Sequence, residues 1–292
     1  MKYLSLLLIF TISQLSFSQD FILLDKETKA PLPFVSVYTT NTGVYSDADG
    51  KVKLTQDFKE TDTISIEMLG FQVKKDVVNN IEKLDTIFLE SKVESLSAVE
   101  LKGETKTVEI EGTDKGGNGF GGPSLTELVC VVNPNEKINK TLLNKVSFYF
   151  KKKRGFRHLR DENEGHYFLY RFNIYEQDKG RFIKIYNSEP FKVDFFDKKE
   201  IVVDVDKYVL MQENIAFGVE CIGFFNEVDE RLEENTIRNV AMTTKKNDFY
   251  DTEMFIKVPY KKDKELFRNL DDLPIESGMY LQFDLELVEI NE

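Results

Sequence analysis

The sequence predicts an all-β protein made of two antiparallel β-sandwiches that follow one another along the chain. Short segments of alternating apolar and polar residues recur along the 292 residues and are separated by turn residues, a pattern typical of sandwiches. Phe (24) and Tyr (12) are abundant, and aromatic residues favour strands. Glycines crowd into residues 116–122 and divide the chain, because glycine weakens helices and strands.

The first residues have the order of a secretory signal peptide. Lys2 gives a positive start, residues 4–10 are apolar, and the small residues Ser16 and Ser18 follow. We expect cleavage after Ser18, so residues 1–18 are the leader. The alternative is an anchored helix, but the apolar stretch is shorter than the roughly 20 residues that a membrane span needs. The protein is therefore expected to be exported, to the periplasm, the outer membrane surface or the extracellular space, with no membrane span after cleavage.

The N-terminal domain is expected over residues 20–101. Apolar segments at residues 21–24, 34–38, 52–54, 63–68 and 84–89 predict short strands. Asp and Gly in residues 46–50, SDADG, predict a tight turn before the third of these segments. No segment predicts a helix, so the pattern indicates an antiparallel sandwich.

Three motifs occur in the order found in a known family. They are PLPFVSVYTTNTGVYSDADGKVKL at residues 31–54, DTISIEMLGFQ at 62–72 and LDTIFLESKVESLSAVEL at 84–101. This part of the chain resembles the carboxypeptidase-regulatory-like domain common in exported Bacteroidota proteins. The resemblance implies a transthyretin-like sandwich of about seven strands. It also implies an accessory module without catalytic residues of its own.

Residues 102–123 are expected to be a glycine-rich linker. A phosphate-binding loop would need a Gly-Lys-Ser/Thr ending, which this segment lacks. Beyond it, residues 124–292 contain further predicted strands at residues 142–150, 167–175, 181–186, 200–205, 215–225 and 279–290. The runs KVSFYF, FLYRFNIY and IVVDVDKYVLMQENIAFGVECIG loosely resemble a jelly-roll-like domain that follows the regulatory module in some flavobacterial surface proteins.

The chain lacks the motifs of common hydrolases. His158 and His166 are its two histidines, and neither belongs to a zinc-protease motif. No Gly-x-Ser-x-Gly motif occurs, and a nucleophile needs a neighbouring base. We therefore expect a protein that is not an enzyme and that carries no cofactor. Paired carboxylates of the glycosidase kind stay open, because sequence does not give their separation.

Two groups of side chains are candidate binding residues. Lys151, Lys152, Lys153, Arg154 and Arg157 form a basic run that is suited to an anionic glycan or lipid headgroup. The acidic residues at 161–164 leave the alternative of a solvated loop whose charges partly cancel. The second group is a set of aromatic residues around Tyr170 that would stack on sugars. Their alternation along the strand equally fits a place in the core.

Two further pairs have both a functional and a structural interpretation. Asp47 and Asp49 are weak candidates for calcium ligands or members of a solvated turn. Cys130 and Cys221 are the only cysteines, and in an exported chain they form either a disulfide or two buried thiols. The net charge of −12 argues against nucleic-acid binding, because phosphate backbones repel an acidic surface.

We therefore expect an exported, non-catalytic envelope protein that acts as a binding or accessory module. Its partner would be an envelope protein or a surface polysaccharide. The alternatives are a glycan-processing enzyme with a carboxylate pair in the C-terminal sandwich, and a structural spacer without ligand.

Overall fold

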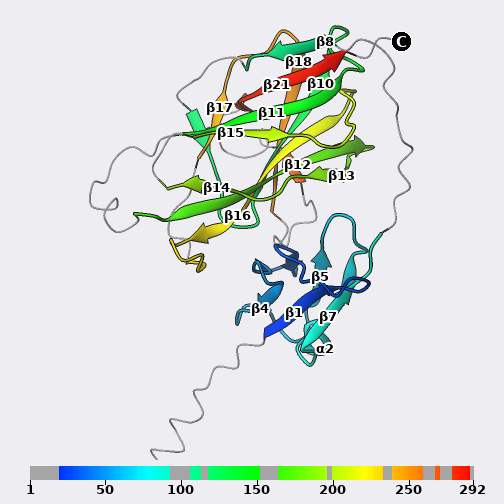
Figure 1. The fold of residues 1–292 in the computed structure, drawn as a ribbon, viewed down its shortest axis with the longest axis vertical. Helices are drawn as coiled ribbons and strands as arrows, with labels where there is room; N and C mark the ends of the chain where they lie inside the picture. Colours follow the sequence, from blue (N-terminus) through cyan, green and yellow to red (C-terminus); the bar gives the residue numbers. More distant parts are fainter. Residues whose placement is uncertain are drawn as a thin grey trace, which may run out of the picture. The chain divides into compact units, whose positions relative to one another are not determined.

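The computed structural model divides the chain into two compact units, residues 1–92 and 93–292. It describes residues 20–92, 106–112, 118–151, 164–195, 199–232, 239–258, 267–269 and 278–289. The predicted leader, residues 1–18, lies outside the described residues. The all-β prediction is confirmed: small sheets come first, and larger sandwich-like sheets follow (Figure 1). No helix of the described residues is long and apolar enough to cross a membrane.

The N-terminal unit contains one sheet in the order β4-β1-β7 and a second in the order β3-β2-β5-β6. All pairs are antiparallel except β1 with β7, which run parallel. Its strands are β1 (Asp20–Asp25), β2 (Ser36–Tyr38), β3 (Gly43–Tyr45), β4 (Lys51–Lys53), β5 (Thr63–Glu67), β6 (Lys74–Val77) and β7 (Thr86–Leu89). A short helix, α2 (Val78–Ile81), follows β6 and was not expected from the sequence.

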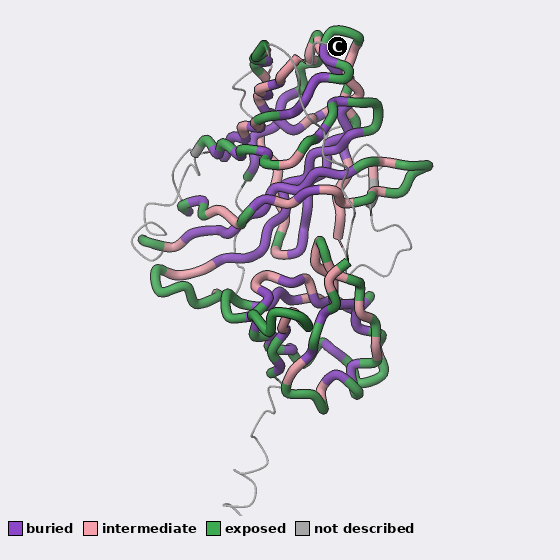
Figure 2. The backbone as a smooth tube through the Cα atoms, turned by 45° about the vertical axis from the view of Figure 1, so that its right-hand side comes forward, coloured by how far each residue is buried: buried purple, intermediate pink, exposed green. Residues whose placement is uncertain are grey.

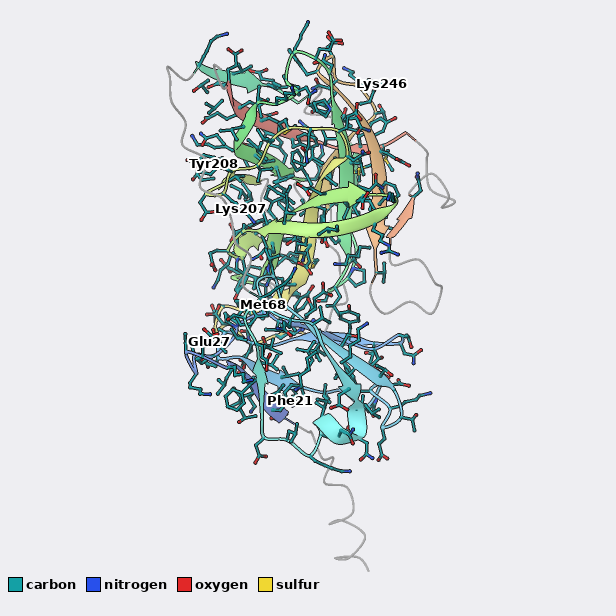
Figure 3. The ribbon with its side chains drawn as sticks, turned by 90° about the vertical axis from the view of Figure 1, so that its right-hand side faces the viewer. Phe21, Glu27, Met68, Lys207, Tyr208 and Lys246 are labelled. Atoms are coloured by element: carbon teal, nitrogen blue, oxygen red, sulfur yellow. The ribbon has the colours of Figure 1, made fainter. Side chains whose placement is uncertain are left out.

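Alternation along the strands builds the core of this unit. Phe21, labelled in Figure 3, and Leu23 are buried on β1, while Ile22 between them is 40% exposed. The helix adds Val78 and Ile81 to the same core. A single turn held by two apolar contacts is too short to give a periodic signal, which explains why the sequence did not predict it.

The C-terminal unit contains two seven-stranded sheets. The first has the order β13-β12-β16-β10-β18-β19, with β14 beside β12, and we call it the central sheet. Its strands are β10 (Glu127–Pro134), β12 (Tyr167–Asp178), β13 (Arg181–Asn187), β14 (Phe191–Asp194), β16 (Ile215–Phe225), β18 (Tyr250–Lys257) and β19 (Phe267–Asn269).

The second sheet has the order β20-β17-β11-β21-β8, with β15 beside β11 and β9 beside β17. Its strands are β8 (Lys106–Ile110), β9 (Asn118–Phe120), β11 (Leu142–Phe150), β15 (Lys199–Asp204), β17 (Val240–Thr243), β20 (Tyr280–Leu281) and β21 (Phe283–Glu289). In Figure 1 the long strands β12 and β16 run side by side, as do β11 and β21.

Aromatic rings join the two sheets across the sandwich. The ring centroids of Phe148 on β11 and Phe172 on β12 are 4.9 Å apart, and those of Phe217 on β16 and Phe283 on β21 are 5.3 Å apart. All four side chains are fully buried. Each of these residues faces inward from its strand, as alternation of side chains along a strand requires.

Three strands of the central sheet, β10, β12 and β16, are buried on their other face as well. Every residue of β12 from Tyr167 to Tyr175 is buried, as is every residue of β16 from Ile215 to Phe224. In Figure 2 the tube is purple along most of these strands. A second apolar cluster, Val129, Val131, Tyr175 and Ala216, lies apart from the main core. We call the face that carries this cluster the outer face of the central sheet.

The expected linker at residues 102–123 is corrected in part. Strand β8 pairs with β21, and β9 pairs with β17, so both belong to the C-terminal unit. The glycines here allow close backbone approach: a Cβ on Gly112 would lie 2.5 Å from the carbonyl oxygen of Phe283, and one on Gly122 would lie 2.4 Å from Thr126 Cγ2. Compositional flexibility was therefore the wrong explanation for these two glycines.

Gly112→Ala is expected to destabilise the C-terminal unit by about 1–3 kcal/mol, because the added methyl group meets backbone atoms that cannot move aside. Urea unfolding followed by circular dichroism measures this change. Glu111→Ala, which truncates an exposed neighbouring side chain, is the control and should stay within about 0.5 kcal/mol of the wild type. Equal stability of the two variants would contradict the packing role of Gly112.

Candidate functional site

The predicted binding residues do not come together as a described site. Lys152, Lys153, Arg154 and Arg157 lie outside the described residues. Lys151 follows β11, is half-buried, and its backbone N–H donates to the carbonyl oxygen of Asn239 at 3.0 Å.

Tyr170 lies in the core, which corrects its assignment to a sugar-binding platform. Its side chain is 2% exposed, and its ring centroid is 4.8 Å from that of Phe150 on the facing sheet. The even-numbered residues of β12, including Phe168 and Phe172, share this inward direction. The core alternative considered from the sequence is therefore the right one for Tyr170.

Asp47 stabilises its own turn. Its carboxylate oxygen Oδ1 accepts hydrogen bonds from the backbone N–H of Asp49 at 2.9 Å and of Lys51 at 2.8 Å. Gly50 completes the turn with φ of +75°, a conformation that favours glycine. Among the described residues no group of three or more His, Cys, Asp or Glu side chains is placed to hold a metal ion. The turn is thus the role that the geometry supports for Asp47.

Cys130 and Cys221 are both free and buried, so the disulfide alternative is corrected. Cys130 on β10 is opposite Phe217 of β16, and Cys221 lies four residues further along β16. At about 3.3 Å per residue this places the two cysteines about 13 Å apart along the strand. Disulfides need Cα atoms within about 7 Å.

Both thiols are expected to be unreactive toward a disulfide reagent in the native protein and reactive in denaturant without prior reduction. Burial raises the pKa of the Cys130 thiol to about 12, and only the thiolate attacks. The measurement is the absorbance of the released reagent before and after denaturation. Thiols that react in denaturant only after reduction would indicate a bridge and contradict the register of β10 and β16.

The outer face of the central sheet holds the described cluster of buried charges. Glu127 on β10 and Glu220 on β16 are directly opposite each other and are 0% and 4% exposed. Lys257 on β18 pairs with Glu127 at 3.5 Å, and Lys184 on β13 pairs with Glu220 at 3.8 Å. Buried charges of this kind need partners because removal from water is costly.

Polar side chains of β12 connect the two acids. Asn173 Nδ2 donates to Glu127 Oε1 at 2.7 Å and to Glu220 Oε2 at 3.0 Å. The Tyr175 hydroxyl donates to Glu127 Oε2 at 2.7 Å. Burial lowers the pKa of the Lys184 ammonium, and the neighbouring Glu220 opposes that shift. We call these six side chains (Glu127, Asn173, Tyr175, Lys184, Glu220 and Lys257) the ion network.

Gly218 makes the ion network possible. A Cβ at this position would lie 2.0 Å from Glu127 Oε1 and 3.1 Å from the Tyr175 ring. The missing side chain therefore provides the space that the Glu127 carboxylate occupies. With this space filled, Glu127 is 0% exposed and Glu220 is 4% exposed, so both carboxylates are shielded from solvent.

Glu127→Gln is expected to lower the free energy of unfolding by about 3–5 kcal/mol. The substitution removes the carboxylate that neutralises Lys257, while Lys257 keeps its positive charge within the protein. The double variant Glu127→Gln, Lys257→Met should recover part of the loss, with a coupling of about 1–3 kcal/mol. Denaturant unfolding of the four proteins of the cycle measures it. Asp229→Asn, at an exposed ion pair with Lys192, should have far less effect. Strict additivity in the cycle would contradict the network.

An open groove at one end of the central sheet is the best candidate site. It has a volume of about 480 Å³, which is in the range of ligand pockets. The end of β10, the turn after it, the loop before β16 and the start of β18 form its walls. The lining residues are Asn133, Pro134, Asn135, Glu213, Asn214, Asn247, Asp248, Tyr250 and Asp251.

Backbone hydrogen bonds fix several of the groove amides in place. Asn133 Oδ1 accepts from the backbone N–H of Asn214 at 2.9 Å, which ties the β10 end to the loop before β16. Asn135 Nδ2 donates to the carbonyl oxygen of Asp248 at 2.8 Å. Asn247 Oδ1 accepts from the N–H of Phe249 at 2.9 Å. The loops are therefore preorganised, which lowers the ordering cost of binding.

Sequence reasoning missed this groove because its residues lie far apart in the chain. Asn133 and Pro134 end β10, and residues 247–251 span the loop before β18 and its first two residues; neither strand was expected from the sequence. Such Asn and Asp residues are ordinary turn signals. Only the register, in which Asn133 is opposite Asp251 and Pro134 is opposite Tyr250, brings the two segments together.

Comparisons with known proteins concern mainly the N-terminal unit. No curated protein matches the chain. A solved clostridial cysteine protease, in its form after propeptide cleavage, aligns with 94% of this chain and 71% of its own, at 10% identity and a TM-score of 0.36. A TM-score this low does not establish a common fold. A family model does match residues 23–101, where the three sequence motifs lie. Residues 23–101 of this chain are a CarboxypepD_reg-like domain.

Proposed function

We propose that this protein is an exported, non-catalytic binding module of the cell envelope. In this proposal a transthyretin-like sandwich at the N-terminus acts as an accessory domain. A jelly-roll-like sandwich at the C-terminus binds a hydroxyl-rich ligand, a surface glycan, in the groove between β10, β16 and β18. The predicted leader at residues 1–18 supports export.

The composition of the groove carries the proposal. Four asparagines, three carboxylates and Tyr250 line it. An asparagine side chain both donates and accepts hydrogen bonds, and so does a sugar hydroxyl. Tyr250 adds an aromatic ring to the lining. This residue is mostly buried, with 8% of its surface exposed. This lining suits a polyol better than an apolar ligand, whose binding needs an apolar cavity.

The ion network does not favour the alternative of a glycan-processing enzyme. A glycosidase needs an acid and a base that flank the substrate. Glu127 is fully buried, and neither it nor Glu220 lines the groove. The arrangement supports a structural role for the carboxylate pair and a binding role for the groove.

Isothermal titration of the mature chain, from Gln19 onward, against soluble neutral polysaccharides (laminarin, mannan and galactan) tests the proposal. We expect one of them to bind, and Asn214→Gly to weaken binding by about fivefold or more through loss of an amide that hydrogen-bonds the ligand. Asn214 has φ of +65°, so glycine fits its backbone without strain.

Lys179→Gly is the matched control, because Lys179 also has positive φ (50°) and is an exposed residue outside the groove. Its affinity should equal that of the wild type. Failure of all three polysaccharides to bind, or equal binding by Asn214→Gly, would overturn the proposal. Shortening of a bound polysaccharide over time would favour the enzyme instead.

A further inference from the structure

We infer that Glu213, Asp248 and Asp251 set the specificity of the groove by rejecting acidic glycans. The ligand is then a glycan that carries no carboxylate, sulfate or phosphate groups. This inference rests on the proposed function, since it concerns the same groove, and it narrows the class of glycan that the groove accepts.

The three carboxylates come from separate segments and meet at one groove. Glu213 lies in the loop before β16, and Asp248 lies in the loop before β18. Asp251 lies on β18, opposite Asn133 of β10. All three side chains are exposed, and among the described residues none of them forms an ion pair. Their negative charge is therefore directed at solvent and at any ligand in the groove.

Among the residues that the structure describes, no cationic side chain lines the groove to offset this charge. Lys137 is near in sequence to Asn135, but its ammonium group lies over the Phe249 ring, 5.8 Å from the centroid. Lys246, labelled in Figure 3, precedes Asn247 and is not part of the lining. Recognition of an anionic sugar ordinarily relies on Arg or Lys paired with the acid, and this groove offers neither.

Amides and carboxylates thus have different tasks in the same groove. The asparagines match hydroxyl groups of any sugar, so they do not distinguish a neutral glycan from an acidic one. The carboxylates accept hydrogen bonds from hydroxyls as well, but they repel a ligand carboxylate. Specificity through an unfavourable contact with the wrong ligand is a common device of binding sites.

The test compares one polysaccharide in two forms. The neutral polysaccharide that binds best among laminarin, mannan and galactan is used as it is and after oxidation of part of its C6 alcohols to carboxylates. We expect the wild-type chain to bind the native form at least about tenfold more tightly. Added salt should narrow this gap, because screening weakens repulsion between exposed charges.

Removal of the three charges should abolish the discrimination. The triple variant Glu213→Gln, Asp248→Asn, Asp251→Asn keeps the shape and hydrogen-bonding groups of the side chains. Its affinities for the native and the oxidised form should lie within about twofold of each other, whatever its affinity for the native form, because the charges that repel the ligand carboxylates are gone. The control triple variant Glu109→Gln, Glu189→Gln, Asp194→Asn changes the net charge equally at exposed positions outside the groove and should keep the wild-type gap.

Each result has a defined meaning. Equal or tighter binding of the oxidised form by the wild type overturns the inference and leaves the proposed function standing. A gap that persists in the groove triple variant also overturns it, since the rejection then comes from elsewhere. Absence of binding to every neutral polysaccharide overturns the proposed function and this inference together.

Discussion

The ion network on the outer face governs the C-terminal unit, because it allows three neighbouring strands, β10, β12 and β16, to be buried on both faces. A sandwich ordinarily buries one face of each sheet and leaves the other to solvent. Here Glu127 and Glu220 lie on a face that also carries the buried apolar residues Val129, Val131 and Ala216. Asn173, Tyr175 and the two lysines supply the hydrogen bonds and charges that these acids would otherwise take from water.

This constraint determines where binding is possible. Strands β10, β12 and β16, whose residues are buried on both faces, offer no broad surface, so their accessible polar groups lie near the strand ends. The groove lies at such an end, where β10, β16 and β18 carry loops. Binding residues commonly occupy loops that a rigid scaffold positions. The buried strands of the central sheet and the groove at their ends thus follow from the same packing arrangement.

Alternation along the strands predicted the all-β class and the inner face of the sandwich, because residues such as Phe148 and Phe172 have strong period-two patterns. It could not predict the burial of the outer face, because polar outward residues such as Arg171 and Asn173 of β12 are typical of a solvent-facing side, yet both are buried in the folded chain. Composition misled at Gly112 and Gly122, where close contacts with the Phe283 backbone and the Thr126 side chain, and not flexibility, favour glycine. The groove depends on the register between β10 and β18, which is a property of the folded chain alone.

Hydrogen exchange of the mature chain, with and without a bound neutral polysaccharide, reports on both the buried strands and the groove. We expect slow exchange throughout the buried strands β10, β12 and β16 in both states, since opening them would expose the ion network. We also expect added protection on binding at residues 133–135, 213–214 and 247–251. Rapid exchange in β12 and β16, or ligand protection confined to residues outside these three segments, would contradict these expectations.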